Sequence, residues 1–242
     1  MGLIEYEPSL AAGYLQHVRH PVQIASIEAF VRGLPETCGR RTALDLGCAP
    51  GTGISLGHGW TPVAIDFSIE SLRIDAARTA AAADLRQVRS VGAGAGLLLM
   101  TDFLKHIATV EARRDLLAEA FAGLAPEGRF CLSFMSLDIV DRLKKNRLGS
   151  CADGTIPYER QTWRDVMRIM PGRVIVAGRH ATNTSRIVGV DRMLSRLPFI
   201  TLLARMIVLT GHERGYRASV SLSSSAITVS GCRSRVRIWC YY

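Results

Sequence analysis

Apolar and polar positions alternate along the chain in blocks that predict strands followed by helices. Apolar runs end at Leu46, at Ile65 and near Thr101, and each is short enough to be a strand buried on both faces. Between such runs lie stretches with apolar residues at helical spacing, for example 113–125. Strands that alternate with helices in this way predict an α/β fold.

Further elements are predicted before and after these runs. Residues 1–34 have apolar positions at helical spacing, with Pro21 between two predicted helices, and would form an N-terminal cap. From Tyr216 the chain becomes rich in Ser, with a weak period of two around Ser230–Gly231 that fits either a marginal hairpin or disorder. The other predicted elements are helices at 68–83, 162–170 and 190–197, a turn at 126–128, and strands at 96–102, 129–135, 173–177 and 204–209.

The stretch from Arg41 to Ser68 carries the strongest chemical signal. A first apolar run contains Asp45, glycines follow at 47, 51 and 53, and a second apolar run ends in Asp66. Glycine lets the backbone turn sharply and approach a ligand, because no Cβ intervenes. Asp66 lies 66 − 45 = 21 residues after the first acid, close to the spacing of a carboxylate that accepts hydrogen bonds from ribose hydroxyls. The pattern predicts a nucleotide-type ligand.

A purely structural interpretation of these residues stays open. Gly47 to Gly53 would then form a tight turn from strand to helix, and Asp66 would cap the helix before Ser68-Ile69-Glu70.

The segment Asp45-Leu-Gly47-Cys-Ala-Pro-Gly51-Thr-Gly53 resembles the Asp/Glu-x-Gly-x-x-x-Gly-x-Gly motif of class I S-adenosylmethionine-dependent methyltransferases. Residues 122–133 are similar to the family's helix, Leu-x-Pro-Gly-Gly turn and strand, with Glu127 in place of the first glycine. The resemblance spans about residues 10–215. It implies a doubly wound, mostly parallel Rossmann-like sheet with a terminal antiparallel strand, in a methyltransferase domain over 1–215 followed by a tail over 216–242.

The resemblance also implies S-adenosyl-L-methionine as the cofactor. Asp45 would face its amino and sulfonium end, Asp66 its ribose, and Tyr14 and Arg19 of the cap would be candidates for the methionine end. The residues expected to bind the cofactor are Asp45, Gly47, Cys48, Gly51, Thr52, Gly53, Asp66, Phe67, Ser68, Thr101 and Asp102.

Methyl transfer needs few dedicated catalytic residues, because alignment of the reacting atoms supplies much of the rate. The candidates come directly after the fourth predicted strand. His106 is the candidate base, since a neutral imidazole can deprotonate a hydroxyl acceptor near neutral pH, and packing is its structural alternative. Asp102 is a candidate to hold the acceptor or to cap the next helix.

The chain departs from the family between Ile65 and Leu97. With a third strand at Leu85 to Val88, only residues 90–95 remain for the crossover, whereas a parallel crossover normally needs a dozen residues or more. Either Leu85 to Val88 is not a proper third strand, or the third-strand edge of the sheet is truncated. Adenine would rest on apolar side chains after Asp66, such as Phe67, without the family's acidic partner for its amine.

Composition and charge limit the classes of partner that the protein is expected to bind. Hydrophobic residues make up 48% of the 242 residues, which is enough for one folded domain. The net charge of +9 is mostly dispersed Arg, so a nucleic-acid surface is not expected, and the six scattered cysteines predict no metal site. The N-terminus has neither a signal peptide nor a myristoylation pattern, which predicts a cytoplasmic protein without a membrane partner.

Together these features predict S-adenosylmethionine-dependent methyl transfer to an oxygen or nitrogen of a small molecule. The main alternative is a degenerate methyltransferase fold that serves as a binding or accessory subunit. A nucleic-acid methyltransferase lacks support because the Asn/Asp-Pro-Pro-Tyr/Phe motif is absent, and an NAD-dependent reductase because no Tyr-x-x-x-Lys pair accompanies Asp45. The sequence does not indicate the oligomeric state.

Overall fold

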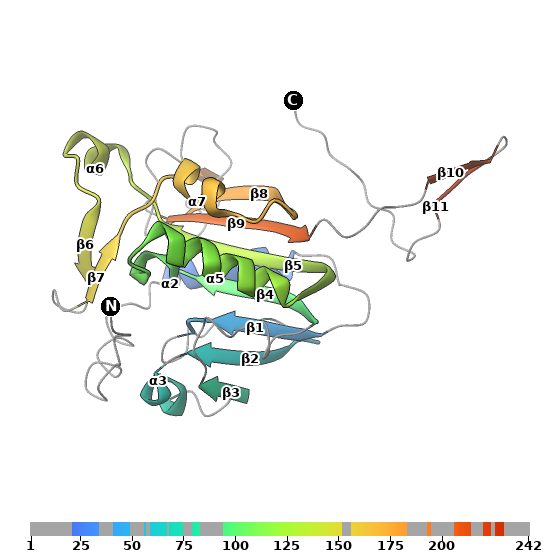
Figure 1. Cartoon of the computed structure of the whole chain (residues 1–242), viewed down its shortest axis with the longest axis horizontal. Coiled ribbons are helices and arrows are strands. Elements are labelled where there is room, and N and C mark those ends of the chain that lie inside the picture. Colours follow the sequence, from blue (N-terminus) through green and yellow to red (C-terminus); the bar gives the residue numbers. More distant parts are fainter. Residues whose placement is uncertain are drawn as a thin grey trace.

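The computed structural model of the chain is built on a mixed sheet with helices on both faces (Figure 1). The structure describes residues 21–33, 41–48, 56, 59–66, 68–74, 79–82, 94–151, 156–182, 193–194, 206–213, 220–223 and 226–229.

The main sheet has seven strands in the order β3-β2-β1-β4-β5-β9-β8. The first five pair in parallel, whereas β9 is antiparallel to both β5 and β8. This confirms the predicted doubly wound sheet with a terminal antiparallel strand. The strands are β1 (Thr42–Leu46), β2 (Thr61–Asp66), β3 (Thr79–Ala82), β4 (Ala95–Thr101), β5 (Leu124–Met135), β8 (Val174–Thr182) and β9 (Met206–Glu213).

Side-chain caps fix where two of the helices begin. Thr109 accepts a hydrogen bond from the Ala112 N–H (3.1 Å), so α5 (Val110–Ala122) begins before the predicted Arg113. Thr162 and Asp165 form a capping box at the start of α7 (Trp163–Ile169), as the pattern over 162–170 predicts. The other described helices are α2 (Pro21–Arg32), α3 (Ile69–Ile74), the short 3₁₀ helix η2 (Leu104–His106) and α6 (Ile139–Leu143).

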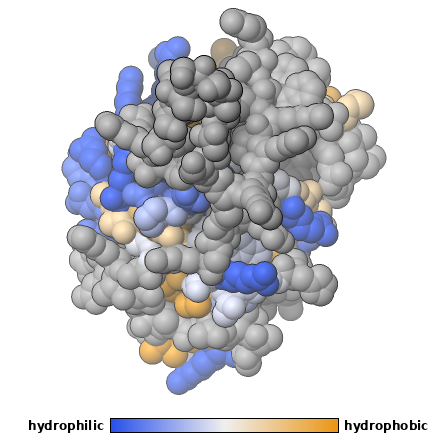
Figure 2. All heavy atoms as spheres, turned by 90° about the vertical axis from the view of Figure 1, so that its right-hand side faces the viewer, coloured by the Kyte–Doolittle hydropathy of each residue, from blue (hydrophilic) through white to orange (hydrophobic). Residues whose placement is uncertain are grey.

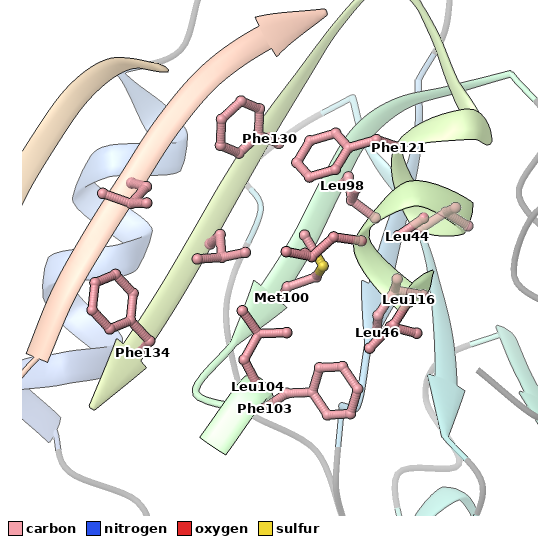
Figure 3. Close-up of a cluster of buried hydrophobic side chains, with 14 of the residues drawn as sticks. Leu44, Leu46, Leu98, Met100, Phe103, Leu104, Leu116, Phe121, Phe130 and Phe134 are labelled. Atoms are coloured by element: carbon pink, nitrogen blue, oxygen red, sulfur yellow. The ribbon is translucent and has the colours of Figure 1, made fainter. Parts of the chain in front are cut away.

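The alternation of side chains along the strands divides the core between the two faces of the sheet. Leu44 and Leu46 of β1 face α5 and α7, in a cluster where the rings of Phe121 and Phe130 meet edge to face at 5.0 Å (Figure 3). Asp45, between the two leucines, therefore lies on the opposite face, which α2 covers. The buried residues of that face are Ile27, Val31, Ala43, Leu97, Leu99, Cys131 and Val208.

The third strand is not where the sequence predicted it. The helix expected over 68–83 is shorter, because α3 ends at Ile74 and Thr79–Ala82 pair in parallel with β2. Leu85 to Val88 lie outside the described residues. From β3 to β4 there are 94 − 82 = 12 residues, which is enough for a parallel crossover. Of the two alternatives, the structure favours the one in which the third strand lies elsewhere, and β3 itself has only four residues.

Two hairpins accompany the main sheet. Strands β6 (Leu148–Cys151) and β7 (Ile156–Glu159) form one that the sequence did not predict, and β7 packs against η2. In the tail, β10 (Val220–Ser223) pairs with β11 (Ala226–Val229), whereas Ser230–Gly231 lies outside the described residues. Figure 2 shows the end of the molecule where the parallel strands begin. On this face, the described hydrophobic and hydrophilic residues are interspersed.

We predict that Glu127→Gly stabilises the protein. Glu127 has φ +67°, in the left-handed region that glycine adopts without a Cβ penalty. After allowing for the greater flexibility of glycine in the unfolded chain, the gain is about 0.5–1 kcal/mol in the free energy of unfolding, measured by urea denaturation.

Gly128→Ala is the matched control. Its Cβ would lie 2.6 Å from Leu124 Cγ and 2.8 Å from the Ala125 carbonyl oxygen, so this substitution destabilises by about 1–3 kcal/mol. An equal loss of stability in both variants would contradict the explanation from backbone strain.

We predict that a chain truncated after Gly215 keeps the fold. The two tail strands pair with each other and not with the main sheet, and Figure 1 shows them away from it. The Ser-rich tail offers little apolar surface against an ordering cost of about 1–2 kcal/mol per residue. The truncated protein should be soluble and melt within a few degrees of the full chain in a thermal scan. Insoluble expression would show that the tail supports the domain.

Candidate functional site

The carboxyl ends of the parallel strands lie on the left in Figure 1, and this end of the sheet is called its carboxyl edge below. Polar residues follow three of these strands. Because β1 lies between β2 and β4, the ends of these strands are neighbours, and the strand order reverses beside β1. The edge brings together the predicted cofactor residues Asp45, Gly47, Cys48, Asp66, Ser68, Thr101 and Asp102. The other predicted residues, Gly51, Thr52, Gly53, Phe67, Tyr14 and Arg19, lie outside the described residues.

Gly47 makes the turn that follows β1. Its φ is +66°, and its N–H donates to the Ile65 carbonyl oxygen of β2 (2.8 Å). A Cβ at this position would lie 2.5 Å from the ring of Phe103, which follows β4. The glycine therefore meets two needs, the left-handed turn and the close approach of Phe103.

Asp45 is a buried carboxylate near the carboxyl end of β1, which lies between β2 and β4. It is 1% exposed and pairs in register with Ala64 on β2 and Leu99 on β4. Burial, together with the Asp45 charge, raises the pKa of the Cys131 thiol to about 12. Cys131 is therefore a neutral packing residue at neutral pH. Cys48 is also buried, and packs with Ala64 and Leu72.

Asp66 and Ser68 shape the turn from β2 into α3. The Ser68 N–H donates to Asp66 Oδ1 (2.9 Å), and the Ser71 N–H donates to Ser68 Oγ (3.2 Å). This is the capping geometry of the structural interpretation, except that Ser68 caps the helix while Asp66 holds the turn before it. Both residues are buried, at 2% and 0% exposure, at the end of β2.

Thr101 and Asp102 end β4. The Asp102 N–H donates to the side-chain oxygen of Ser133 on β5 (2.9 Å), and its φ is +56°, which points the chain away from the strand direction. Its carboxylate pairs with Lys105 Nζ through Oδ2 (2.5 Å). Burial raises the pKa of the Asp102 carboxyl, while the Lys105 ammonium opposes that rise.

His106 lies where η2 meets the β6–β7 hairpin. Its Nδ1 is 3.4 Å from the Pro157 carbonyl oxygen, and burial, together with the nearby Lys105 charge, lowers its pKa to about 4. The imidazole is therefore neutral at neutral pH. Since a carbonyl oxygen only accepts, Nδ1 carries the proton and Nε2 has the lone pair.

The residues that hold His106 in place were not predicted from the sequence. Lys105 is 5% exposed and lies 5.0 Å from the centre of the Tyr158 ring. Arg113 of α5 donates to Glu159 of β7 (2.7 Å), which ties the hairpin to the domain. A buried Asp–Lys pair at i, i+3 within an apolar run is a signal present in the sequence, whereas the contacts from β7 come from residues about fifty positions away.

We predict that His106 makes stability depend on pH below neutrality. The unfolded histidine titrates near 6.5 and the folded one near 4, so between these values the unfolded state binds more protons. Stability is therefore lost as pH falls from 6.5 towards 4, by up to about 1.4 kcal/mol per pH unit from this residue.

The measurement is urea denaturation of the wild type and His106→Gln at several pH values. Asp102 and His212, whose pKa values are also shifted, remain in both proteins, so the difference isolates His106. The variant should lose less stability on acidification. Parallel curves would mean that the imidazole has the same pKa in the folded and the unfolded protein.

In the described part of the chain, no group of three or more His, Cys, Asp and Glu residues is placed to hold a metal ion. None of the helices described is long and apolar enough to cross a membrane.

The strand order, the reversal beside β1 and the terminal antiparallel strand define the fold of the class I S-adenosylmethionine-dependent methyltransferases. One similar structure is the N-methyltransferase NodS from Bradyrhizobium japonicum WM9 in complex with S-adenosyl-L-homocysteine, at 14% identity and a TM-score of 0.54, covering 78% of this chain and 86% of that one. No protein-family model and no curated protein sequence matches the chain.

Two further structures support the same fold. A methyltransferase from Methanosarcina mazei is 14% identical, with a TM-score of 0.57 over 76% of this chain and 96% of that one. Magnesium protoporphyrin IX methyltransferase from Synechocystis PCC 6803 with bound S-adenosylmethionine is 17% identical, with a TM-score of 0.53 over 81% and 80%.

Proposed function

We propose that the protein transfers a methyl group from S-adenosyl-L-methionine to an oxygen or nitrogen of a small-molecule acceptor. The observation that carries the proposal is the position of Asp45 and Asp66, two buried carboxylates on adjacent strands, beside the left-handed Gly47 turn and where the strand order reverses. The two structures solved with S-adenosylmethionine or its product share this fold.

The residues at this edge fit that cofactor by their chemistry. Asp66 would accept hydrogen bonds from the ribose hydroxyls, and Asp45 would face the amino and sulfonium end. Gly51, Thr52, Gly53 and Phe67 complete the proposed binding loop by sequence. Cys48 packs with Ala64 and Leu72, and Ser68 caps the helix that follows Asp66.

The bound cofactor would supply an activated methyl group, so the protein's task is to align the acceptor and keep water out. Thr101, Asp102 and His106 lie at the end of β4, on the side of β1 away from β2. His106 is neutral near pH 7 and can take a proton from the acceptor at Nε2. The proposal places the enzyme in the cytoplasm, with neither a membrane nor a nucleic acid as its partner.

We predict that Asp66→Asn weakens the binding of S-adenosylhomocysteine by about tenfold or more in a calorimetric titration. Asparagine keeps an oxygen to accept from the Ser68 N–H, so the turn is preserved, but it loses the charge that strengthens hydrogen bonds from hydroxyl groups. Asp115→Asn, at an exposed position on α5, is the control and should bind as the wild type does.

Unchanged affinity in the Asp66→Asn protein would contradict the assignment of the ribose site. If the wild type binds the ligand but transfers no methyl group, the alternative of a binding or accessory subunit is supported instead.

A further inference from the structure

A group of buried polar atoms at the carboxyl end of β4 has no hydrogen-bond partner in the described part of the chain. These atoms are Thr101 Oγ1, Asp102 Oδ1 and His106 Nε2. Thr101 and Asp102 are 7% and 8% exposed. The large majority of buried side-chain polar atoms are hydrogen-bonded in folded proteins, and leaving one unsatisfied costs about 1–3 kcal/mol. Three such atoms within six residues therefore indicate a place built to receive a polar ligand.

Lys105 connects two members of this group. Its Nζ is 2.5 Å from Asp102 Oδ2, and its charge is one of the causes that keep His106 neutral. The Tyr158 ring, 5.0 Å from Nζ, covers the ammonium from the side of β7. The Asp102 carboxylate is thus held by one oxygen, which leaves Oδ1 to bind something else.

The β6–β7 hairpin fixes the other side of the group. The Pro157 carbonyl oxygen accepts from His106 Nδ1, and Gln161 Nε2 donates to the Leu104 carbonyl oxygen (3.4 Å). The Gln161 backbone also bonds to Met135 and Leu137 at the end of β5, at 2.9 and 3.0 Å. The hairpin therefore holds η2, and with it the orientation of the imidazole.

The hydrogen-bonding capacity of these atoms selects the ligand. An ionised Asp102 Oδ1 accepts, and His106 Nε2 accepts because Nδ1 carries the proton. A single group of the ligand that satisfies both acceptors must supply two hydrogen atoms. A hydroxyl oxygen has one, whereas the nitrogen of a neutral primary amine has two N–H bonds and keeps its lone pair for attack.

We propose that Asp102, His106 and Thr101 form the acceptor subsite and that it takes a neutral primary amine, so that nitrogen and not oxygen is methylated. This inference rests on the proposed methyl transfer. Lys105 is a positioning residue, because it holds Asp102. Its charge and the burial of the site also favour the uncharged form of a bound amine, as they do for His106.

The reaction balances with these groups. The amine lone pair forms the new N–C bond while the C–S bond of the sulfonium breaks, and sulfur keeps the electron pair of that bond. The nitrogen then carries a positive charge and releases one proton, which His106 Nε2 accepts. Product release returns this proton to solvent.

The test uses the full chain with benzylamine and benzyl alcohol as matched probes. S-adenosylhomocysteine binding is measured first by calorimetry, and its absence in the wild type would overturn the proposed function itself. With binding present, incubation with S-adenosylmethionine should yield N-methylbenzylamine by mass spectrometry, and at least tenfold less benzyl methyl ether. Equal or greater transfer to the alcohol, or transfer to neither probe, would overturn the amine subsite.

Variants then separate the roles of the residues. Asp102→Asn and His106→Gln should each lower kcat/KM for benzylamine at least about tenfold while S-adenosylhomocysteine still binds, and Asp115→Asn should not. A calorimetric titration of benzylamine into the protein saturated with S-adenosylhomocysteine measures acceptor binding without turnover. This binding should weaken in the same two variants.

Lys105→Met tests the positioning role through the pH profile. Without the ammonium, the bound amine keeps its proton to higher pH, so the acid limb of the profile should move to higher pH, with Asp102 and Tyr158 still present beside the site. An unchanged limb in Lys105→Met, or unchanged amine binding in both Asp102→Asn and His106→Gln, would overturn the proposal.

Discussion

The register of β1 between its two parallel neighbours is the constraint on which the site depends. Asp45 is aligned with Ala64 and Leu99, so its carboxylate lies on the α2 face while Leu44 and Leu46 enter the core under α5. A slip of one residue would turn the carboxylate into the core under α5 and move the two leucines to the α2 face. The bond from the Gly47 N–H to the Ile65 carbonyl oxygen continues the ladder one residue beyond the strand. The pairing that builds the sheet thus also places its polar edge.

The elements predicted best were those with two agreeing signals. Buried strands such as β4 are apolar throughout, and α7 has both helical spacing and a capping box in its sequence. The third strand failed because Thr79-Ala-Ala-Ala82 has a composition that favours helix, and only its pairing with β2 makes it a strand. The crossover argument failed with it, since it started from the wrong strand.

The candidate site divides in the same way. The acids and Gly47 were predictable because each needs a particular residue type at a particular spacing. The arrangement around His106 was not predicted, because Tyr158 and Pro157 reach it from a hairpin about fifty residues further along the chain. Asp153-Gly154, between the two strands of that hairpin, is a turn signal that was overlooked. The left-handed backbone at Asp102 is also invisible in the sequence, since aspartate is common in ordinary turns and caps.

The contact between Gly47 and Phe103 joins the two halves of this edge. The ring fills the space that a Cβ would take, so the turn after β1 and the segment after β4 share one packed volume. Side chains at 47 and 103 cannot change size independently, and substitutions there will be non-additive. In evolution, the proposed acceptor subsite and the proposed cofactor subsite are therefore linked. A change of substrate that enlarges residue 103 would have to be accommodated by the turn that the cofactor is proposed to rest on.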